Sequence, residues 1–312
     1  MSATSNGSNP LRKIEFGLGT WQWGDQFMWG YGRGYAEADL RASFDVSVAA
    51  GVTFIDTAEV YGLGRSEKFL GRFLQSSGLR ALVATKFFPF PWRVSKGQLR
   101  AALRASLDRL GVDAVDLYQM HWPFPPVRIE TWMDAMADAV AAGWVRSVGV
   151  SNYDPGQTRR AYAALKARGL ALTANQVPYS LLDRHIEHNG LLALCQELDV
   201  RVIAYSPLAQ GLLSGKYTPQ NPPPGLRGRR YARVLQRVEP LVTALREIGQ
   251  AHNGRTPAQV ALNWCLCKGT LPIPGAKNAR QAEQNAGTLG WRLTRAEVAR
   301  LDQLSDQVTS GA

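Results

Sequence analysis

Residues 81–122 read ALVATKFFPFPWRVSKGQLRAALRASLDRLGVDAVDLYQMHW and contain one complete strand–helix–strand repeat. The apolar runs at 81–87 and 115–122 are typical of buried strands, and the segment between them repeats its apolar residues at helical spacing up to Gly111. A glycine at that position is typical of a helix C-terminus. Two strands joined by such a helix pair in parallel, so this stretch predicts an α/β protein.

The same alternation of strand and helix patterns runs through the rest of the chain. Strands are expected at residues 14–21, 52–57, 81–87, 115–122, 145–152, 172–177, 200–206 and 270–275. Helical patterns lie between them, and a further one follows at 294–308. We therefore expect a single (β/α)8 TIM barrel over residues 13–312 with an extra C-terminal helix, preceded by a flexible N-terminal segment of residues 1–12.

Composition indicates a soluble globular protein: 45% of the 312 residues are hydrophobic and 20% are charged. No apolar run is long enough for a membrane span, and the N-terminal residues lack the apolar core of a secretory signal. Three cysteines, Cys195, Cys265 and Cys267, match neither a disulfide framework nor a zinc motif. These features predict a cytoplasmic protein without a membrane partner.

The net charge of +11 points to an anionic partner or ligand. The basic residues are mostly scattered, and the one dense run lies within residues 225–237, after a stretch rich in proline and glycine. We expect this run to form a solvated loop that leads into a helix. No nucleic-acid reader motif accompanies the charge, so nucleic acid is not an expected partner.

Polar residues stand at the ends of the expected strands, where a barrel of this kind places its chemistry. Asp56 ends the second strand and Tyr61 follows it, while Lys86 and His121 end the third and fourth. A tyrosine near a lysine makes a general acid, because the ammonium lowers the pKa of the hydroxyl and the carboxylate holds the lysine. With His121 orienting the acceptor oxygen, the set suits carbonyl reduction, which also needs a nicotinamide or flavin to supply hydride.

The later strand ends carry groups that suit a nicotinamide cofactor. Tyr205 offers a flat face to the ring, and amide and hydroxyl groups near it, on Ser151, Asn152 and Gln176, suit its carboxamide. After the last strand, Gly275, Lys277 and Arg280 stand at the start of a helix, which favours a 2′-phosphate.

The sequence resembles the aldo-keto reductase superfamily over nearly its whole length, in the stretches GLGTWQWG, FIDTAEVYGLGRSE, ATKF, LGVDAVDLYQMHWP, VRSVGVSNY, NQVPYSLLDR, IAYSPLAQGLLSGKY and PIPGAKN. The resemblance implies an NADPH-dependent reductase of a small aldehyde or ketone, with catalytic Asp56, Tyr61, Lys86 and His121. It implies cofactor contacts from Trp21, Ser151, Asn152, Gln176, Tyr205, Ser206, Pro207, Leu208, Gln210, Gly211, Leu213, Lys216, Ile273, Gly275, Lys277, Arg280, Gln281, Gln284 and Asn285. Where many members carry Lys-Ser and a later Arg, this chain has Gly275-Ala276 and Gln281, as in a bacterial and plant-plastid branch.

Aromatic residues just past the strand ends are candidates for the substrate pocket, namely Trp23, Phe87, Trp92 and Trp122. The substrate itself stays open, because the loops after strands 1, 4 and 7 set it.

Other interpretations of these residues remain. Taken alone, Asp56 and Lys86 are compatible with a structural ion pair, although Tyr61 and His121 at neighbouring strand ends favour the catalytic interpretation. His185, Glu187 and His188 form an H-x-x-H pattern that lacks the usual spacing of a metal helix. No metal site is expected. A regulatory binding subunit of the same family and a phosphate-handling isomerase on the same barrel are the rival functions.

Overall fold

The computed structural model describes residues 9–224 and 226–309, and within them all eight expected strands form one parallel sheet in sequence order. The strands are β1 (Gly17–Gly19), β2 (Phe54–Asp56), β3 (Leu82–Phe87), β4 (Leu117–Met120), β5 (Val148–Ser151), β6 (Leu172–Pro178), β7 (Arg201–Tyr205) and β8 (Leu271–Pro272). A parallel bridge between Gly19 and Gly275 joins the two ends of the sheet, so the strands close into a barrel. The predicted TIM barrel is confirmed.

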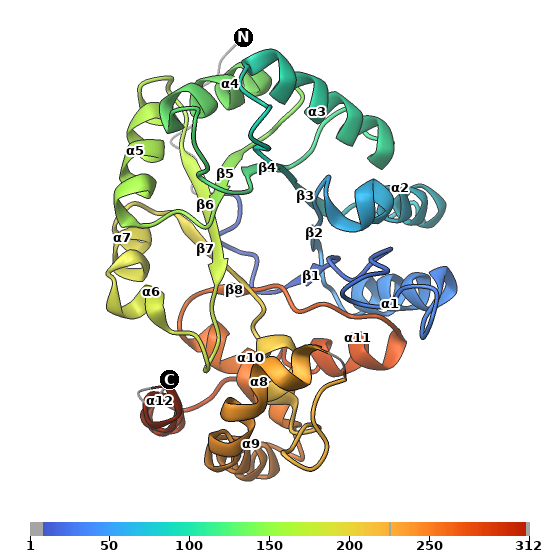
Figure 1. Cartoon of the computed structure of the whole chain (residues 1–312), viewed down its shortest axis with the longest axis vertical. Coiled ribbons are helices and arrows are strands. Elements are labelled where there is room, and N and C mark those ends of the chain that lie inside the picture. Colours follow the sequence, from blue (N-terminus) through green and yellow to red (C-terminus); the bar gives the residue numbers. More distant parts are fainter. Residues whose placement is uncertain (1–8, 225, 310–312) are drawn as a thin grey trace.

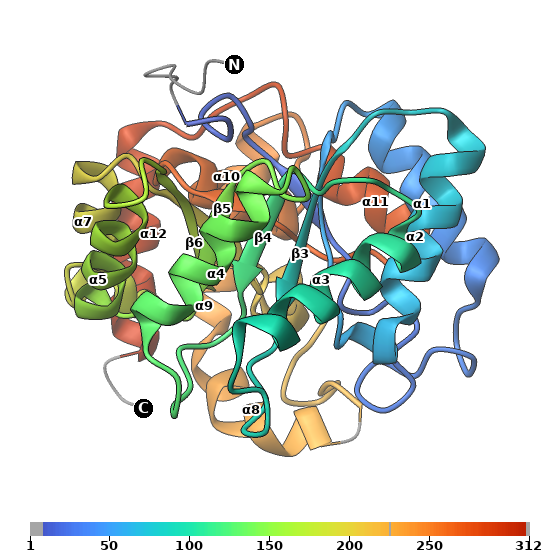
Figure 2. The same cartoon turned by 90° about the horizontal axis from the view of Figure 1, so that it is seen from above.

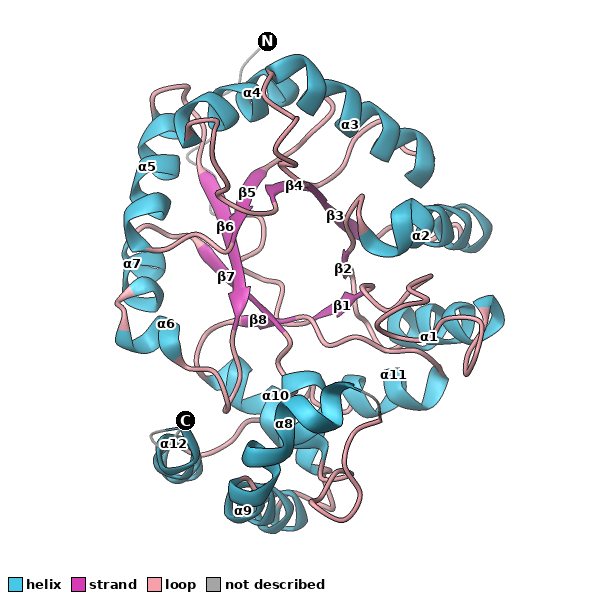
Figure 3. Ribbon diagram, viewed as in Figure 1, coloured by secondary structure: helices cyan, strands magenta, loops and turns pink. Residues whose placement is uncertain are grey.

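Helices surround the ring of strands on all sides (Figures 1 and 3). They are α1 (Glu37–Ala49), α2 (Arg65–Ser77), α3 (Lys96–Leu110), α4 (Ile129–Ala141), α5 (Pro155–Lys166), α6 (His185–His188), α7 (Leu191–Glu197), α8 (Leu226–Arg237), α9 (Glu239–Ala251), α10 (Pro257–Cys267), α11 (Ala279–Ala286) and α12 (Arg295–Thr309), with 3-10 turns η1 (Tyr61–Gly64) and η2 (Ala209–Ser214). Seen from the side, α3 and α4 cross in front of β3 and β4 (Figure 2).

Side-chain caps fix where several of the helices begin. The side chains of Ser95, Asp154 and Thr256 each accept a hydrogen bond from the backbone N–H three residues later. The residue at that position is a glutamine, whose Oε1 accepts in turn from the backbone N–H of the cap residue. Such capping boxes satisfy backbone donors that the first helical turn leaves without a partner. Ser95 and Asp154 thereby end the loops that follow β3 and β5, and Thr256 ends the connection between α9 and α10.

The packed structure begins earlier than expected at the N-terminus. Leu11 is buried within the barrel among inward-facing strand residues such as Phe54 and Leu117. Asn9 Nδ2 donates to the backbone oxygens of Thr173 and Asp199, each at 2.8 Å. Residues 9–12 are therefore ordered against the barrel, contrary to the expected flexible segment of residues 1–12, whose first eight residues lie outside the described part.

We expect Leu11→Ala to lower the free energy of unfolding by about 2–5 kcal/mol, because the floor of a closed barrel cannot collapse onto the lost side chain. Leu79→Ala is the matched control, since Leu79 is 45% exposed and its loss leaves no cavity. Urea denaturation of both variants measures the difference. Equal stability of the two variants would contradict the packing described for Leu11.

The basic run forms a helix rather than a loop. Residues 226–237 are α8, which packs against α9 and buries Leu235, while Arg229, Arg233 and Arg237 are exposed. The expected loop is therefore wrong for residues 226–237, because Tyr231, Val234 and Leu235 repeat at helical spacing; residue 225 lies outside the described part of the chain. No helix in the described part of the chain is long and apolar enough to span a bilayer.

The appended C-terminal helix is confirmed as α12. Trp264 Nε1 donates to Asp302 at 2.8 Å, and Lys268 and Arg184 also contact Asp302. These contacts attach α12 to α10 and to the loop before α6.

Candidate active site

A cavity of about 540 Å³ opens at the carboxyl ends of the strands. It is lined by Gly19, Thr20, Trp21, Gln22, Trp29, Asp56, Val60, Tyr61, Phe88, His121, Trp122, Ser151, Asn152, Gln176, Tyr205, Ser206, Pro207, Leu208, Gln210, Gly211, Ser214, Lys216, Tyr217, Ala258, Ile273, Pro274, Gly275, Lys277, Arg280, Gln281, Gln284 and Asn285. All but one of the residues expected to hold a cofactor are in this set. Residues from every strand end thus share one space.

A buried ion pair lies beneath the cavity. Lys86 Nζ donates to Asp56 Oδ2 at 2.6 Å and to the backbone oxygen of Thr57 at 2.8 Å, and neither charged side chain has more than 2% of its surface exposed. Burial lowers the pKa of Lys86, while the charge of Asp56 and its hydrogen bond act against that shift. The pairing offsets the desolvation cost, which is several kcal/mol for each buried ion.

Two glutamine side chains complete the surroundings of Asp56. Gln176 Nε2 donates to Asp56 Oδ1 at 2.7 Å, and Gln119 Nε2 does so at 3.3 Å. In the sheet, Gln119 lies opposite Lys86 on the neighbouring strand. Sequence analysis missed Gln119; its signal was the inward position two residues before His121 in β4.

The Tyr61 hydroxyl lies 3.2 Å from Lys86 Nζ, which donates to it. The pKa of Tyr61 is well above the ordinary tyrosine value, because burial disfavours the phenolate and the charge of Asp56 disfavours it further. The expectation that the lysine would lower this pKa is therefore wrong here. Tyr61 keeps its proton throughout the neutral range, so its hydroxyl accepts from Lys86 and still has a proton to donate.

His121 faces Tyr61 with their ring centroids 6.0 Å apart. Its Nδ1 is buried and has no hydrogen-bond partner among the residues that the structure describes. Burial and the nearby Lys86 charge hold the pKa of His121 well below its usual range, so the imidazole is neutral. A neutral imidazole can donate a hydrogen bond without competing for the proton of Tyr61.

A polar cluster lies across the cavity from these groups. Tyr205 donates to Asn152 Oδ1 at 2.9 Å, and Asn152 Nδ2 donates to Ser151 Oγ and to the backbone oxygen of His121. The backbone of Asn152 has φ = 62°, and Ser206 and Gln210 are also left-handed, with φ of 51° and 55°. Non-glycine residues in this conformation store strain, which is concentrated at functional sites.

The segment after β8 meets the cavity at the start of α11. Asn278 caps this helix by accepting from Gln281 N at 3.0 Å, and Lys277 Nζ donates to the backbone oxygen of Trp29 at 2.9 Å. A Cβ atom at Gly275 would meet the amide end of the Gln22 side chain, which would have to move to make room for it. Arg280 is exposed beside the cavity. The expected phosphate segment is thus brought to the cavity wall.

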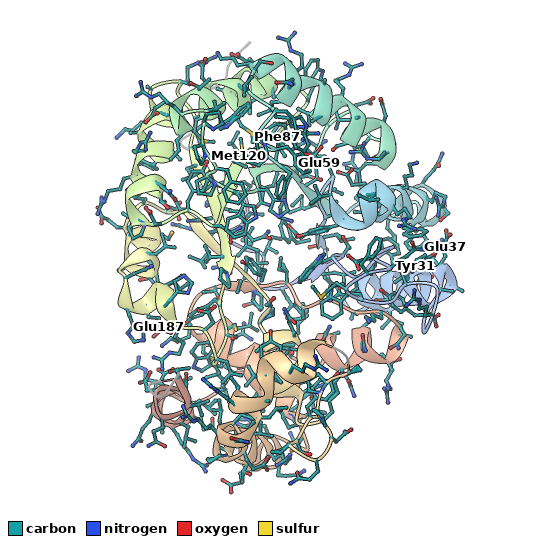
Figure 4. The ribbon with its side chains drawn as sticks, in the orientation of Figure 1. Tyr31, Glu37, Glu59, Phe87, Met120 and Glu187 are labelled. Atoms are coloured by element: carbon teal, nitrogen blue, oxygen red, sulfur yellow. The ribbon has the colours of Figure 1, made fainter. Side chains whose placement is uncertain are left out.

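Five expected site residues do not line the cavity, namely Lys86, Trp23, Phe87, Trp92 and Leu213. Lys86 is fully buried and contacts Asp56 and Tyr61, which do line it. Trp23 is fully buried and packs on Phe73, and Leu213 is likewise fully buried. Phe87 lies beside Met120 between the strands and helices α3 and α4 (Figure 4), where it packs on Trp132. Since successive strand residues point to opposite faces, an inward Lys86 requires an outward Phe87.

Trp92 is 68% exposed and stacks on Phe90, with the ring centroids 4.8 Å apart. Of the four residues expected in the substrate pocket, only Trp122 lines the cavity, and Trp23, Phe87 and Trp92 are corrected. Residues that were not assigned to the site also line it, among them Gln22, Trp29 and Tyr217. They come from loops, whose course a sequence pattern does not fix.

Among residues 9–224 and 226–309, no group of side chains could hold a metal ion. In the H-x-x-H segment, Glu187 accepts from Tyr179 at 2.5 Å and from Arg184 at 2.8 Å, and His185 Nδ1 lies 2.6 Å from Asp183. These partners give the segment a structural role.

Comparison with known proteins gives one consistent match. The sequence profile described as the Aldo/keto reductase family matches residues 15–306. A chloroplastic pyridoxal reductase of Arabidopsis thaliana is 42% identical over 306 residues, which cover 94% of this chain and 83% of that protein. Among solved structures, an aldo-keto reductase from Klebsiella pneumoniae in complex with NADPH is 31% identical with a TM-score of 0.73, covering 93% of this chain and 90% of that one. A glycerol dehydrogenase from Gluconobacter oxydans is 27% identical with a TM-score of 0.78, covering 94% and 92%.

Proposed function

The chain belongs to the aldo/keto reductase family, and from this premise we propose that residues 13–312 form one reductase domain that converts an aldehyde or ketone into the alcohol with NADPH. The observation that carries the proposal is the contact of buried Lys86 with Tyr61 and Asp56, which both line the cavity. A protonated phenol at an open cavity, held by a buried ion pair, is the donor that carbonyl reduction requires.

Each of the four central residues has a separate task in this proposal. NADPH, when bound, supplies the hydride. Tyr61 donates its proton to the carbonyl oxygen as negative charge develops there, and the Lys86 ammonium stabilises the phenolate that remains. Asp56 keeps Lys86 charged and in place. The neutral His121 orients the carbonyl oxygen by donating a hydrogen bond.

The cavity fits a dinucleotide cofactor on several counts. Its volume is that of a ligand site. The buried Gln22 Oε1 has no hydrogen-bond partner among the described residues, so it can accept a hydrogen bond from a bound ligand. Lys277 and Arg280 bring positive charge to the start of α11. We propose that Asn152, with Ser151, Gln176 and Tyr205, holds the nicotinamide end, and that the residues after β7 and β8 hold the phosphates.

The substrate is proposed to be a small carbonyl compound. Pyridoxal, which gives the plant relative its name, is the first substrate to assay, followed by a panel of aldehydes and ketones. Loss of reduced-nicotinamide absorbance with formation of one alcohol per NADPH supports the proposal. Failure of the purified protein to oxidise NADPH with any member of the panel would refute it.

The phosphate segment gives a prediction about cofactor choice. We expect Lys277→Ala with Arg280→Ala to weaken NADPH binding at least about tenfold, because charge-assisted contacts contribute about 1.5–3 kcal/mol each before exposure is discounted. NADH lacks the 2′-phosphate, so its affinity should hardly change. Fluorescence titration with both cofactors measures this.

Ionic strength provides an independent check on the same contact. Affinity for NADPH should fall with added salt more steeply than affinity for NADH. An equal loss of affinity for NADPH and NADH in the double variant would contradict the contact with the 2′-phosphate. It would show that Lys277 and Arg280 contact the pyrophosphate that both cofactors share, or that they stabilise the fold.

A further inference from the structure

Glu59 lies between Asp56 and Tyr61 in the sequence, yet it takes no part in the ion pair beneath the cavity. Its side chain is 8% exposed, and Oε1 accepts from Arg93 Nη1 at 2.5 Å while Oε2 accepts from Nη2 at 3.2 Å. Oε1 also accepts the backbone N–H of Phe88 at 2.7 Å. The carboxylate therefore joins the segment that carries Tyr61 to the loop that follows β3.

Arg93 also contacts the end of β3 and the loop after it directly, at Phe87, Phe88 and Phe90. Its Nη1 donates to the backbone oxygen of Phe88 at 3.0 Å, and its guanidinium lies over the rings of Phe87 at 4.9 Å and Phe90 at 5.2 Å. The backbone N–H and C=O of Phe88 are thus both held by one ion pair. Arginine suits this place because its planar group pairs with a carboxylate and stacks on rings at once.

Phe88 is a wall of the cavity, and its ring meets His121 edge-on, with the centroids 5.4 Å apart. The centroid of the Phe88 ring lies 6.1 Å from that of Phe124, and the Phe124 ring stacks on Trp122 with the centroids 5.3 Å apart. Phe88 and Trp122 both line the cavity together with His121, so aromatic rings form this part of its wall.

A buried ion pair is a weak source of stability, since apolar residues of the same size would serve as well. The ion pair instead fixes the positions of both side chains, because two parallel hydrogen bonds join them. We propose that Glu59 and Arg93 are positioning residues that hold Phe88 against His121, and that Phe88 determines specificity by favouring a carbonyl attached to a flat ring. This inference rests on the proposed reductase function.

The test compares benzaldehyde with heptanal, which have the same number of heavy atoms. The measured quantity is the ratio of kcat/KM for the two aldehydes with NADPH. We expect Phe88→Leu to lower the preference for benzaldehyde about two- to tenfold, the range that aromatic pairs contribute. Glu59→Gln and Arg93→Gln should lower it by a similar factor, because Phe88 is then no longer held.

The double variant Glu59→Gln with Arg93→Gln should change the ratio no more than either single variant, since the two residues act as one unit. A merely structural role would reduce the active fraction and lower both rates equally, which leaves the ratio unchanged. The affinity for NADPH, measured by fluorescence, should be the same in all these variants.

A matched control exists elsewhere in the chain. Glu37 pairs with Arg72, whose guanidinium lies over the ring of Phe69 at 5.0 Å, but this pair is exposed on the outside of α1 and α2. Figure 4 shows Glu37 at the rim of the molecule and Glu59 near the end of β3. Glu37→Gln should leave the aldehyde ratio unchanged.

Two outcomes would overturn the inference. An unchanged kcat/KM ratio in Phe88→Leu would show that Phe88 does not determine specificity. This variant keeps every backbone contact of the loop, so it remains informative if Glu59→Gln does not fold. An unchanged kcat/KM ratio in folded Glu59→Gln and Arg93→Gln would show that the ion pair does not position Phe88. In either case both aldehydes are still reduced, whereas failure of the proposed function would leave the wild-type protein inactive on both.

Discussion

We expect Tyr61→Phe to lower kcat for carbonyl reduction by about 10² to 10⁴, the usual contribution of general acid catalysis, and to leave NADPH affinity nearly unchanged. The substitution removes only the hydroxyl that accepts from Lys86 Nζ at 3.2 Å. The phenyl ring keeps its place beside Trp21 and His121, at centroid distances of 6.5 and 6.0 Å. The proton donor is therefore lost while the cavity keeps its shape.

Steady-state kinetics and a fluorescence titration with NADPH measure the two effects separately. Tyr162→Phe is the control, because it also removes a tyrosine hydroxyl, but from α5 outside the cavity. Retention of more than about a tenth of the wild-type kcat in Tyr61→Phe would remove Tyr61 from the role of acid.

The second large effect concerns the ion pair beneath the cavity. We expect Lys86→Met to lower the free energy of unfolding by about 3–5 kcal/mol, because it leaves the carboxylate of Asp56 buried without its cation. The remaining donors to Asp56 are the neutral amides of Gln119 and Gln176, which do not balance the charge. Catalysis should be lost as well, since the phenolate of Tyr61 is no longer stabilised.

The double variant Asp56→Asn with Lys86→Met should be more stable than Lys86→Met alone, because no buried charge is left unpaired. Urea denaturation of the three variants measures this. Arg41→Met is the control, since the Arg41–Asp45 pair is exposed and should contribute less than about 1 kcal/mol. A stability loss in Lys86→Met no greater than in Arg41→Met would contradict the account of the buried pair.

The barrel and the central residues were predictable from sequence because they depend on local patterns and one topological rule. Eight short apolar runs alternate with helical patterns, and parallel strands place their carboxyl ends together. Asp56, Lys86 and His121 stand at such ends, so their convergence followed from the order of elements alone. The helix start near Lys277 and Arg280 was likewise predictable, because polar residues precede a helical pattern there.

The residues that sequence reasoning misplaced depend on side-chain direction and on loops. Phe87 follows Lys86 directly, and the alternation of a strand sends it to the helices. Leu11 and α8 were taken as unstructured because polar or basic neighbours masked their apolar residues. Trp29 reaches the cavity through a long loop after β1, and no periodic pattern predicts such a course.

The pKa of Tyr61 shows where charge arguments made from residue types fail. A nearby ammonium and burial shift a phenol in opposite directions, and sequence alone does not give the degree of burial. In the structure burial dominates, so Tyr61 stays protonated. The raised pKa keeps the proton on Tyr61 before reaction, and its transfer then depends on stabilisation of the phenolate by Lys86.

The central claim is hydride transfer to a carbonyl carbon with a proton from Tyr61, and isotope labelling tests it most directly. The wild-type protein is supplied with an aldehyde and NADPH deuterated on both faces of the reactive ring carbon, and mass spectrometry follows the alcohol. We expect one deuterium on the former carbonyl carbon for each NADPH consumed, at a rate that falls by a factor of about 10² to 10⁴ in Tyr61→Phe. NADPH oxidation without a labelled alcohol, or an equal rate of labelling in Tyr61→Phe, would contradict it.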